Sequence, residues 1–248
     1  MRHDVRRAGV FGRFGSAMLL VAIVAAMFVA PIGVQLAAAQ DDVTIQTRVQ
    51  VLHASPDLGE IEVHINYDEV LDELEYGDQS DWIDFEPGGA RFTVTADRAG
   101  FNYAIYDAVY PAPAGNDYYL IITDALVLGG VFDRSPIPDG GARVRIVQGS
   151  VDLPAVNVAA TAGNVTFATE LDYARSSDYA AVPAGTYDLE VTLADTGEAV
   201  LSAPGMVLEG NTTYDLVIMG QPGDENHPLE IRPLMDTTTE RPDATPAS

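Results

Sequence analysis

The chain has no cysteine and no lysine among its 248 residues, and it has one tryptophan. The missing cysteine excludes disulfides, thiol nucleophiles and zinc–thiolate sites, so stability must come from a buried core. The missing lysine leaves 13 arginines against 37 acidic residues, a formal net charge of −24. A surface this acidic repels the phosphates of nucleic acid and of anionic lipid, so neither is an expected partner. The acidity fits two explanations: solubility in an exterior medium that screens like charges, or cation binding.

The first 39 residues have the composition of an export signal. Four arginines precede the apolar run Ser16–Ala30, and Leu36–Ala39 offers small residues before Gln40. This order is typical of a cleaved signal peptide, which predicts a secreted or cell-envelope protein with no membrane insertion after cleavage. A retained anchor is the alternative, since Ser16–Leu36 is long enough to span a bilayer. Arg6-Arg7 leaves the twin-arginine export route open. Without residues 1–39 the chain keeps 9 basic and 36 acidic residues.

The body of the chain repeats itself at a spacing of about 95 residues. The segment Arg48–Asp57 returns as Arg143–Asp152. The other repeated pairs are Ser80-Asp81-Trp82 with Ser177-Asp178-Tyr179, Pro87-Gly88-Gly89 with Pro183-Ala184-Gly185, Gly115-Asn116 with Gly210-Asn211, and Tyr119 with Tyr214. A unit of this length is a domain, too long for a solenoid repeat, and it can bury a core of its own.

Alternation of apolar and polar residues predicts short strands in both units. Ile61, Val63 and Ile65 alternate with Glu62 and His64, for example, and turn sequences follow roughly every ten residues. The pattern predicts an all-β fold of two tandem β-sandwich domains, immunoglobulin-like or transthyretin-like, preceded by the signal peptide. The expected boundaries are a signal peptide at 1–39, a lead-in at 40–47, a first sandwich at 48–132, a linker at 133–142, a second sandwich at 143–235 and a disordered tail at 236–248.

The repeated segments resemble a family of bacterial exported domains of unknown function. Repeats of that family open with Arg-Val and His-Ala-Ser-Pro-Asp, and later carry Ser-x-Tyr and Pro-Ala-Gly-x-Tyr. Here Arg48–Asp57 matches the opening, while Ser177-Asp178-Tyr179 and Pro183–Tyr187 match the later part. The second opening has diverged, because Gln148 replaces the histidine. The resemblance covers nearly all of the chain after the leader. It implies family membership but no activity, since the family has no assigned catalytic residues.

His53, Ser55 and Asp57 offer the residue types of a hydrolase triad within five positions. A triad needs side chains that converge from distant parts of the chain, which neighbours at one strand end rarely do. The expected role is structural: Ser55 and Asp57 cap a turn through backbone N–H groups, and His53 points inward and bonds the turn backbone. Gln148 in the second unit supports this interpretation, because glutamine can donate and accept hydrogen bonds but cannot act as a base.

Asp78, Asp81 and Asp84 lie within seven residues beside a turn and are the candidate ligands for a calcium ion, the one cofactor that the sequence suggests. A solvated acidic loop is the competing interpretation. A transition-metal site of His53 and His64 is not expected, because their strand parities differ and predict that His53 points inward and His64 outward.

Tyrosines are dense in the first unit, at positions 103, 106, 110, 118 and 119, near Trp82. Such residues serve in strand cores and at binding surfaces alike. Because Tyr103 and Tyr106 differ in parity, at least one of them is expected to be exposed.

The expected function is non-enzymatic: an exported module that binds or scaffolds an unidentified extracellular ligand or envelope component. The alternative is an extracellular hydrolase of wall polymer or polysaccharide, which needs two carboxylates facing each other across a cleft. No spacing singles out such a pair, and no phosphate loop, G-x-S-x-G or H-E-x-x-H motif occurs. A concave pocket with two convergent carboxylates or a histidine would favour the enzyme.

Overall fold

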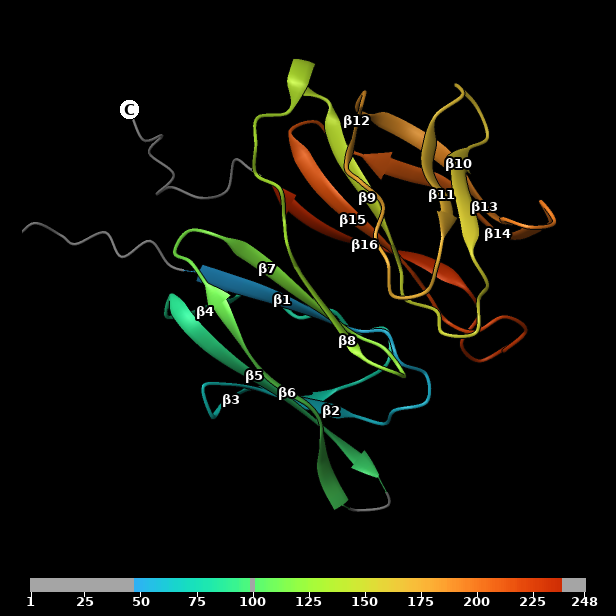
Figure 1. The fold of residues 1–248 in the computed structure, drawn as a ribbon. Coiled ribbons are helices and arrows are strands. Elements are labelled where there is room, and N and C mark those ends of the chain that lie inside the picture. The colour runs from blue at the N-terminus through green and yellow to red at the C-terminus, as the bar shows by residue number, and fades with distance from the viewer. Residues whose placement is uncertain (1–46, 99–100, 238–248) are drawn as a thin grey trace, which may run out of the picture. The chain divides into compact units, whose positions relative to one another are not determined.

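Strands make up nearly all of the regular structure. The structure is a computed structural model that describes residues 47–98 and 101–237, so the expected signal peptide lies outside the described residues (Figure 1). The helical segment in these ranges is the short 3₁₀ turn η1 over Pro138–Gly140. In the described part of the chain, no helix has the length and apolar character needed to cross a membrane.

The first repeat contains eight strands in two four-stranded sheets. They are β1 (Thr47–His53), β2 (Ile61–Ile65), β3 (Asp68–Leu74), β4 (Ile83–Phe85), β5 (Gly88–Arg98), β6 (Phe101–Ala112), β7 (Asp117–Ile122) and β8 (Val127–Val131). One sheet has the order β4-β1-β7-β8 and the other the order β3-β2-β5-β6. Strands β1 and β7 pair in parallel, and all other neighbours are antiparallel.

The second repeat has the same topology. Its strands are β9 (Ala142–Gln148), β10 (Val156–Ala160), β11 (Thr166–Leu171), β12 (Ala180–Val182), β13 (Gly185–Leu193), β14 (Ala199–Leu208), β15 (Thr212–Met219) and β16 (Glu230–Thr237). The sheets β12-β9-β15-β16 and β11-β10-β13-β14 reproduce the first repeat strand for strand. Two tandem β-sandwiches are therefore confirmed. The first two strands of each repeat lie in different sheets, which excludes the immunoglobulin arrangement and leaves the transthyretin-like one.

Strand pairing corrects one detail of the repeat. Val49 lies opposite Tyr118, and its counterpart Val144 lies opposite Tyr214. Tyr118 is therefore the counterpart of Tyr214, and the expected pairing of Tyr119 with Tyr214 is wrong by one residue. The spacing of 95 holds at the repeat opening and becomes 96 at this strand. A one-residue change exchanges the two faces of a strand, so Tyr119 points away from the core that Tyr118 contacts.

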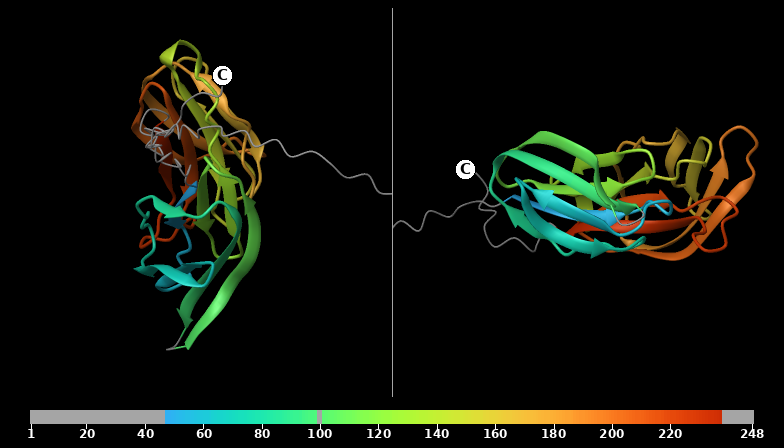
Figure 2. Two further views of the ribbon diagram at one scale, coloured as in Figure 1. Left: turned by 90° about the vertical axis from the view of Figure 1, so that its left-hand side faces the viewer. Right: turned by 90° about the horizontal axis from the view of Figure 1, so that it is seen from below.

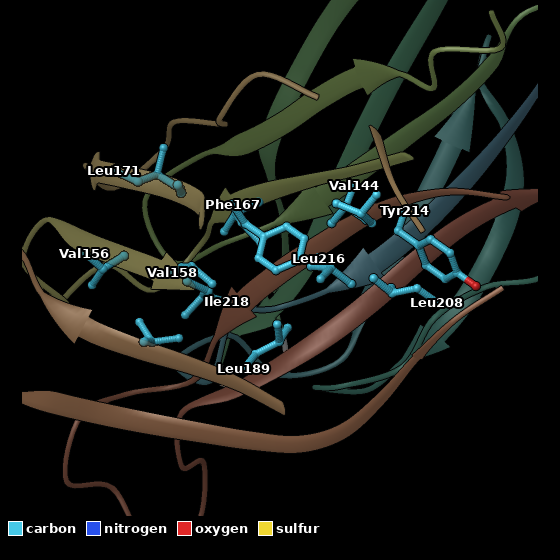
Figure 3. Packing of buried hydrophobic residues seen from close by; sticks show 14 of the residues in the cluster. Val144, Val156, Val158, Phe167, Leu171, Leu189, Leu208, Tyr214, Leu216 and Ile218 are labelled. Atoms are coloured by element: carbon cyan, nitrogen blue, oxygen red, sulfur yellow. The ribbon is translucent and has the colours of Figure 1, made fainter. Parts of the chain in front are cut away.

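Each sandwich encloses its own apolar core. In the second repeat Val144, Val158, Leu189, Leu216 and Ile218 are fully buried between the two sheets (Figure 3). The first repeat has an equivalent core around Val51, Val63, Val94 and Ile122. Full burial of an aliphatic side chain contributes roughly 1.5–3 kcal/mol, so these positions account for much of the stability of each repeat.

A third core joins the two repeats. Its buried members are Leu52, Ala54, Tyr119, Ile121, Phe132, Val147, Val217, Met219 and Leu234. Most of them lie on the central strands β1, β7, β9 and β15, on the faces opposite to those that supply the sandwich cores. These central strands are therefore buried on both faces. This explains why β15 is buried along its whole length and lacks the alternation of a half-exposed strand.

Ionic groups border this third core. Both Nε and Nη2 of Arg48 bond Asp117, at 2.9 and 3.1 Å, and Nη2 also bonds Asp236 at 3.2 Å. Arg134 lies 3.3 Å from Asp117 and 3.4 Å from Asp236. The side chains of both aspartates are fully buried. Two carboxylates from different repeats thus share two guanidinium groups.

A second buried ion pair involves Arg145. Its Nε and Nη2 bond the two carboxylate oxygens of Asp215 at 2.8 and 2.7 Å, and Nη2 donates to the hydroxyl of Tyr119 at 2.8 Å. The guanidinium lies 4.2 Å from the ring centre of Tyr179. Arg48 lies 4.1 Å above Trp82 in the same way, and Trp82 is the sequence counterpart of Tyr179. Both repeats thus have an aromatic ring at this position. The arginine that covers the ring in the second repeat is Arg145, two residues after Arg143, the counterpart of Arg48.

The ends of the second domain differ from expectation. Strand β16 includes Asp236 and Thr237, two residues of the expected disordered tail. The sequence does not reveal this part of the strand, because Asp236 is a polar residue that is nevertheless fully buried, where it pairs with Arg48 and Arg134. The expected linker is also held in place, since the backbone oxygen of Asp133 accepts from Arg143 at 2.8 Å and from Thr213 at 2.9 Å.

Candidate functional site

His53 is a structural residue. It is fully buried, its Nε2 donates to the backbone oxygen of Gly59 at 2.9 Å, and its Nδ1 accepts from the backbone N–H of Ser55 at 3.3 Å. Burial lowers its pKa, which favours the neutral ring that these two bonds require. Gln148 makes the equivalent bonds: its Nε2 donates to Leu153, and its Oε1 accepts from Ser150. The inward, turn-bonding role expected for His53 is confirmed.

The triad interpretation has no support from the geometry. Ser55 is fully buried, and its hydroxyl donates to Asp124, a residue of another loop. The same carboxylate accepts the backbone N–H of Asp57 at 3.1 Å. Asp124 therefore holds the turn that Asp57 was expected to cap. In the described part of the chain, no hydrogen bond from the side chain of Asp57 to backbone is found, so the capping prediction is wrong for Asp57. It is confirmed for Ser55, whose hydroxyl accepts the backbone N–H of Leu58 at 3.2 Å.

Replacing His53 should separate hydrogen bonding from acid–base chemistry. We expect His53→Gln to keep nearly all of the stability, because glutamine already makes the same bonds at position 148. We expect His53→Leu to lower the free energy of unfolding by about 1–3 kcal/mol, because it leaves the buried N–H of Ser55 unpaired and removes the hydrogen bond to the backbone oxygen of Gly59. Urea denaturation measures both. Equal losses for the two variants would show that the hydrogen bonds are not what position 53 supplies.

The three candidate calcium ligands have different environments. Asp78 accepts the backbone N–H of Glu75 at 3.2 Å, and Asp84 lies on β4 directly opposite Arg48. Asp81 is exposed beside them. In the described residues, one group of three acidic or histidine side chains brings its ligand atoms within 4.8 Å of one another, and these aspartates are not in it. The structure does not gather Asp78, Asp81 and Asp84 into a cation site.

The histidines are also separated. His53 lies on β1 and His64 on β2, in different sheets. His64 is on the outer face of its strand, as parity predicts, since Ile61, Val63 and Ile65 occupy the core face. His227 lies in the loop before β16 and is 3.1 Å from Asp224.

Tyrosines line the free edge of the first sandwich. Tyr103, Tyr106 and Tyr110 lie on β6, the outermost strand of its sheet, which forms the long green hairpin with β5 in Figure 2. Tyr103 and Tyr110 are each 38% exposed, and Tyr106 is half-buried. The rings of Tyr106 and Tyr110 stack with an interplanar angle of 16° and a centroid distance of 6.4 Å. We call these three residues the tyrosine edge.

A β-bulge aligns this row. Val94 pairs with Tyr106, Thr95 with Ala104 and Ala96 with Tyr103, so β6 has one extra residue at position 105. The extra residue restores the same face for both tyrosines, although simple alternation places them on opposite faces. The prediction that at least one is exposed is confirmed, but its premise of opposite faces is wrong. The bulge re-aims Tyr103 into line with Tyr106 and Tyr110.

Two hollows lie along the tyrosine edge, and each is lined by both β6 and the segment around β8. The polar hollow has a volume of about 410 Å³ and contains Tyr103 together with Asp57, Asp97 and Asp124. The apolar hollow, of about 200 Å³, is lined by Tyr110, Pro111, Tyr118 and Gly129 among others. The tyrosine edge thus runs between a carboxylate-rich end and an apolar end.

The second repeat lacks these features at the equivalent positions. The pairing of neighbouring strands shows that Leu201 is the counterpart of Tyr106 and that Met206 is the counterpart of Tyr110. Gly129 corresponds to Pro233 in the same way. Gly129 pairs with Leu120, and Pro233 pairs with Leu216, the counterpart of Leu120. A Cβ atom on Gly129 would be in van der Waals contact with Leu120, at 3.4 Å, and Gly129 lines the apolar hollow. The same fold carries an open aromatic edge in one repeat only.

Hydroxyl groups also meet along the edge. The hydroxyls of Tyr106 and Tyr110 are hydrogen-bonded to each other. Burial and this bond raise the pKa of Tyr106, so the phenol remains protonated in neutral solution. The edge therefore offers flat rings and hydroxyl groups, while the carboxyl side chains of three aspartates lie at its polar end. Sequence reasoning found the tyrosines but missed Gly129 and Asp124, whose roles depend on residues far along the chain.

Comparison with known proteins identifies a family. The family model described as a domain of unknown function, DUF4397, matches residues 47–159 and 142–248. A search of curated proteins gives no match. One similar solved structure is CBMbc, a family CBM26 module from Eubacterium rectale Amy13K in complex with maltoheptaose, at 8% identity, TM-score 0.23, covering 80% of this chain and 98% of that one. Another is a candidate cell adhesion protein from Bacteroides fragilis NCTC 9343, at 9% identity, TM-score 0.20, covering 75% and 97%. At these TM-scores neither likeness supports a functional conclusion.

Proposed function

Since the chain belongs to the DUF4397 family, whose function is not assigned, we propose a function from its own site: a non-enzymatic, extracytoplasmic binding protein. The first repeat holds a neutral polysaccharide chain along the tyrosine edge. The second repeat supports the first through the third core. The extracytoplasmic location rests on the composition of residues 1–39.

The observation that carries the proposal is the difference between the two repeats. Each repeat has the same strand order, yet the edge strand of the first has Tyr106 and Tyr110 where the second has Leu201 and Met206. A purely structural edge strand would be served by either set. The apolar hollow lined by Gly129 and the partial exposure of Tyr103 and Tyr110 add to the contrast. Exposed tyrosines beside concave surfaces are the residues that binding sites favour.

The chemistry of the edge suits a neutral sugar chain. A pyranose ring has an apolar face of C–H groups that packs on a flat aromatic ring, and its hydroxyls donate to carboxylates such as those of Asp57, Asp97 and Asp124 in the polar hollow. From Tyr103 to Tyr110 the strand extends about 23 Å, at about 3.3 Å per residue, which suits several linked sugar units. The strong negative charge opposes binding of an acidic polymer.

Mutation of the tyrosine edge should abolish binding without unfolding the protein. We expect the double variant Tyr106→Ala/Tyr110→Ala to bind neutral polysaccharide at least about tenfold more weakly, because buried aromatic contacts each contribute more than about 1 kcal/mol. Affinity electrophoresis in gels that contain α-glucan, β-glucan, mannan or xylan measures the retardation. Tyr106→Phe/Tyr110→Phe should retain the stacking contribution and most of the retardation.

Tyr67→Ala is the matched control, because Tyr67 is 75% exposed and does not belong to the edge. Equal losses for the control and the edge variant, or no retardation of the unaltered protein by any of the four polymers, would contradict the proposal. The alternative of a hydrolase draws on the three aspartates in the polar hollow. Release of reducing ends during incubation, lost in Asp124→Asn, would favour that enzyme over a binding protein.

A further inference from the structure

Glu62, His64 and Glu69 form a compact group on the outer face of the first repeat. Glu62 and His64 are alternate residues of β2, and β3 returns beside them through the turn at Asn66 and Tyr67. Both turn residues have left-handed φ angles, 52° and 75°, which makes the reversal tight and places Glu69 directly opposite His64. One ligand atom from each of the three side chains lies within 4.8 Å of the other two.

Neighbouring side chains hold Glu62 in position. Thr95 donates to its Oε2 at 3.0 Å, and Asn102 donates to its Oε1 at 2.7 Å. Thr95 is the cross-strand partner of Glu62 on β5, and Asn102 comes from β6. Hydrogen bonds of this kind orient the carboxylate ligands of metal sites.

His64 has a nitrogen without a partner. Its Nδ1 is shielded from solvent, and in the described residues it has no hydrogen-bond partner. A buried polar atom normally has one, because leaving it unpaired costs about 1–3 kcal/mol. The ring is half-buried beside two carboxylates, so the group combines a nitrogen ligand, two oxygen ligands and a local negative charge.

We infer that Glu62, His64 and Glu69 bind a divalent transition-metal cation, for which Zn²⁺ is the best match. Imidazole nitrogen and carboxylate oxygen are established zinc ligands. The filled d shell of Zn²⁺ imposes no preferred coordination geometry, so the ion can adapt to the ligands present. Three protein ligands leave a fourth position open for water or for a group from another molecule. Calcium is a poorer match, because it takes six to eight oxygen ligands.

The second repeat provides an internal comparison. Its counterparts of Glu62 and His64 are Asn157 and Ala159, and Thr166 lies opposite Ala159. Asn157 instead accepts a backbone N–H from Glu170 at 2.9 Å. The same two strands therefore carry no such group in the second repeat, and one zinc ion is expected in the part of the chain that the structure describes. The site faces away from the core side of the sheet and does not depend on the proposed polysaccharide binding.

Zinc titration of the metal-stripped protein tests the inference. We expect isothermal titration calorimetry with zinc chloride to show one saturable site, and His64→Ala to weaken it at least tenfold. Glu69→Gln should weaken it as well, because one charged ligand is lost. His227→Ala is the matched control, since His227 pairs with Asp224 outside the group. X-ray absorption of the zinc-loaded protein should show nitrogen and oxygen ligands with a single histidine.

Several outcomes would overturn the inference. They are the absence of saturable zinc binding, binding unchanged in His64→Ala, or binding lost in His227→Ala. Calcium and magnesium chloride serve as further arms, and calcium binding of equal strength that survives His64→Ala would also contradict the assignment. Unchanged melting temperatures of the metal-free variants show that each remains folded, so a loss of binding reports on the site itself.

Discussion

Arg145→Met is expected to lower the free energy of unfolding by about 3–5 kcal/mol. Removing one partner of a buried ion pair leaves the other charge without compensation, and this cost exceeds what the pair itself contributes. Asp215 has a fully buried side chain, and both of its carboxylate oxygens are bonded to Arg145. The substitution also removes the hydrogen bond to Tyr119, which joins the two repeats. Urea denaturation at neutral pH measures the loss.

Two further variants make this result specific. Arg91→Met breaks the exposed ion pair with Asp107, in which the Arg91 side chain is 36% and the Asp107 side chain 39% exposed. It should cost far less, because water screens exposed charges. The double variant Arg145→Met/Asp215→Leu removes both charges and should recover a large part of the stability lost by Arg145→Met alone. If Arg145→Met is no more harmful than Arg91→Met, the buried pair does not have the role given to it here.

Stability is expected to decrease as the pH rises from about 4 to about 6. Burial, followed by repulsion from Asp117, raises the pKa of Asp236 from its ordinary value of 3.8 to about 6. The folded state then binds a proton more tightly than the unfolded state, so this stabilisation is complete below the ordinary pKa. It is lost as the pH rises through the folded pKa. A shift of about two units corresponds to at most about 3 kcal/mol. Burial raises the pKa of Asp215 in the same direction.

Thermal melts at pH 4.5 and pH 7 check this dependence, and salt separates its two sources. Repulsion among surface carboxylates also weakens the protein as the pH rises, but high sodium chloride screens it, while the buried contribution persists. Asp236→Asn cannot titrate and should flatten the remaining slope in high salt. A slope as steep in Asp236→Asn as in the unaltered protein would assign the effect to other groups.

Local pattern was a reliable guide to the fold class and to the repeat. Alternation of apolar and polar residues along a strand shows which residues face a core. Five residues of β2 are enough to show it, because Ile61, Val63 and Ile65 are buried and the two residues between them are not. The repeat itself supplied a control, because Gln148 showed that position 53 needs hydrogen bonds and not a base. The signal peptide remains a prediction from composition, since those residues lie outside the described part of the chain.

Alternation cannot reveal what covers the second face of a sheet. Tyr119, Ile121 and Val217 are buried because another sheet packs on them, and that sheet comes from the other repeat. Asp236 also depends on a distant partner, since it pairs with Arg48 of the other repeat. The sequence around Asp236 therefore has the pattern of a polar tail and not of a strand. A β-bulge, invisible in composition, put Tyr103 and Tyr106 on one face.

The candidate sites show the same division. Asp78, Asp81 and Asp84 are close in sequence and are not gathered into a ligand group, whereas Glu69 joins Glu62 and His64 through a tight turn and a strand pairing. Residue types and their spacing thus established two β-sandwiches, an acidic surface and a tyrosine-rich first repeat. Strand register and sheet packing decided which side chains meet, because contacts between strands depend on partners that can lie far away in the chain.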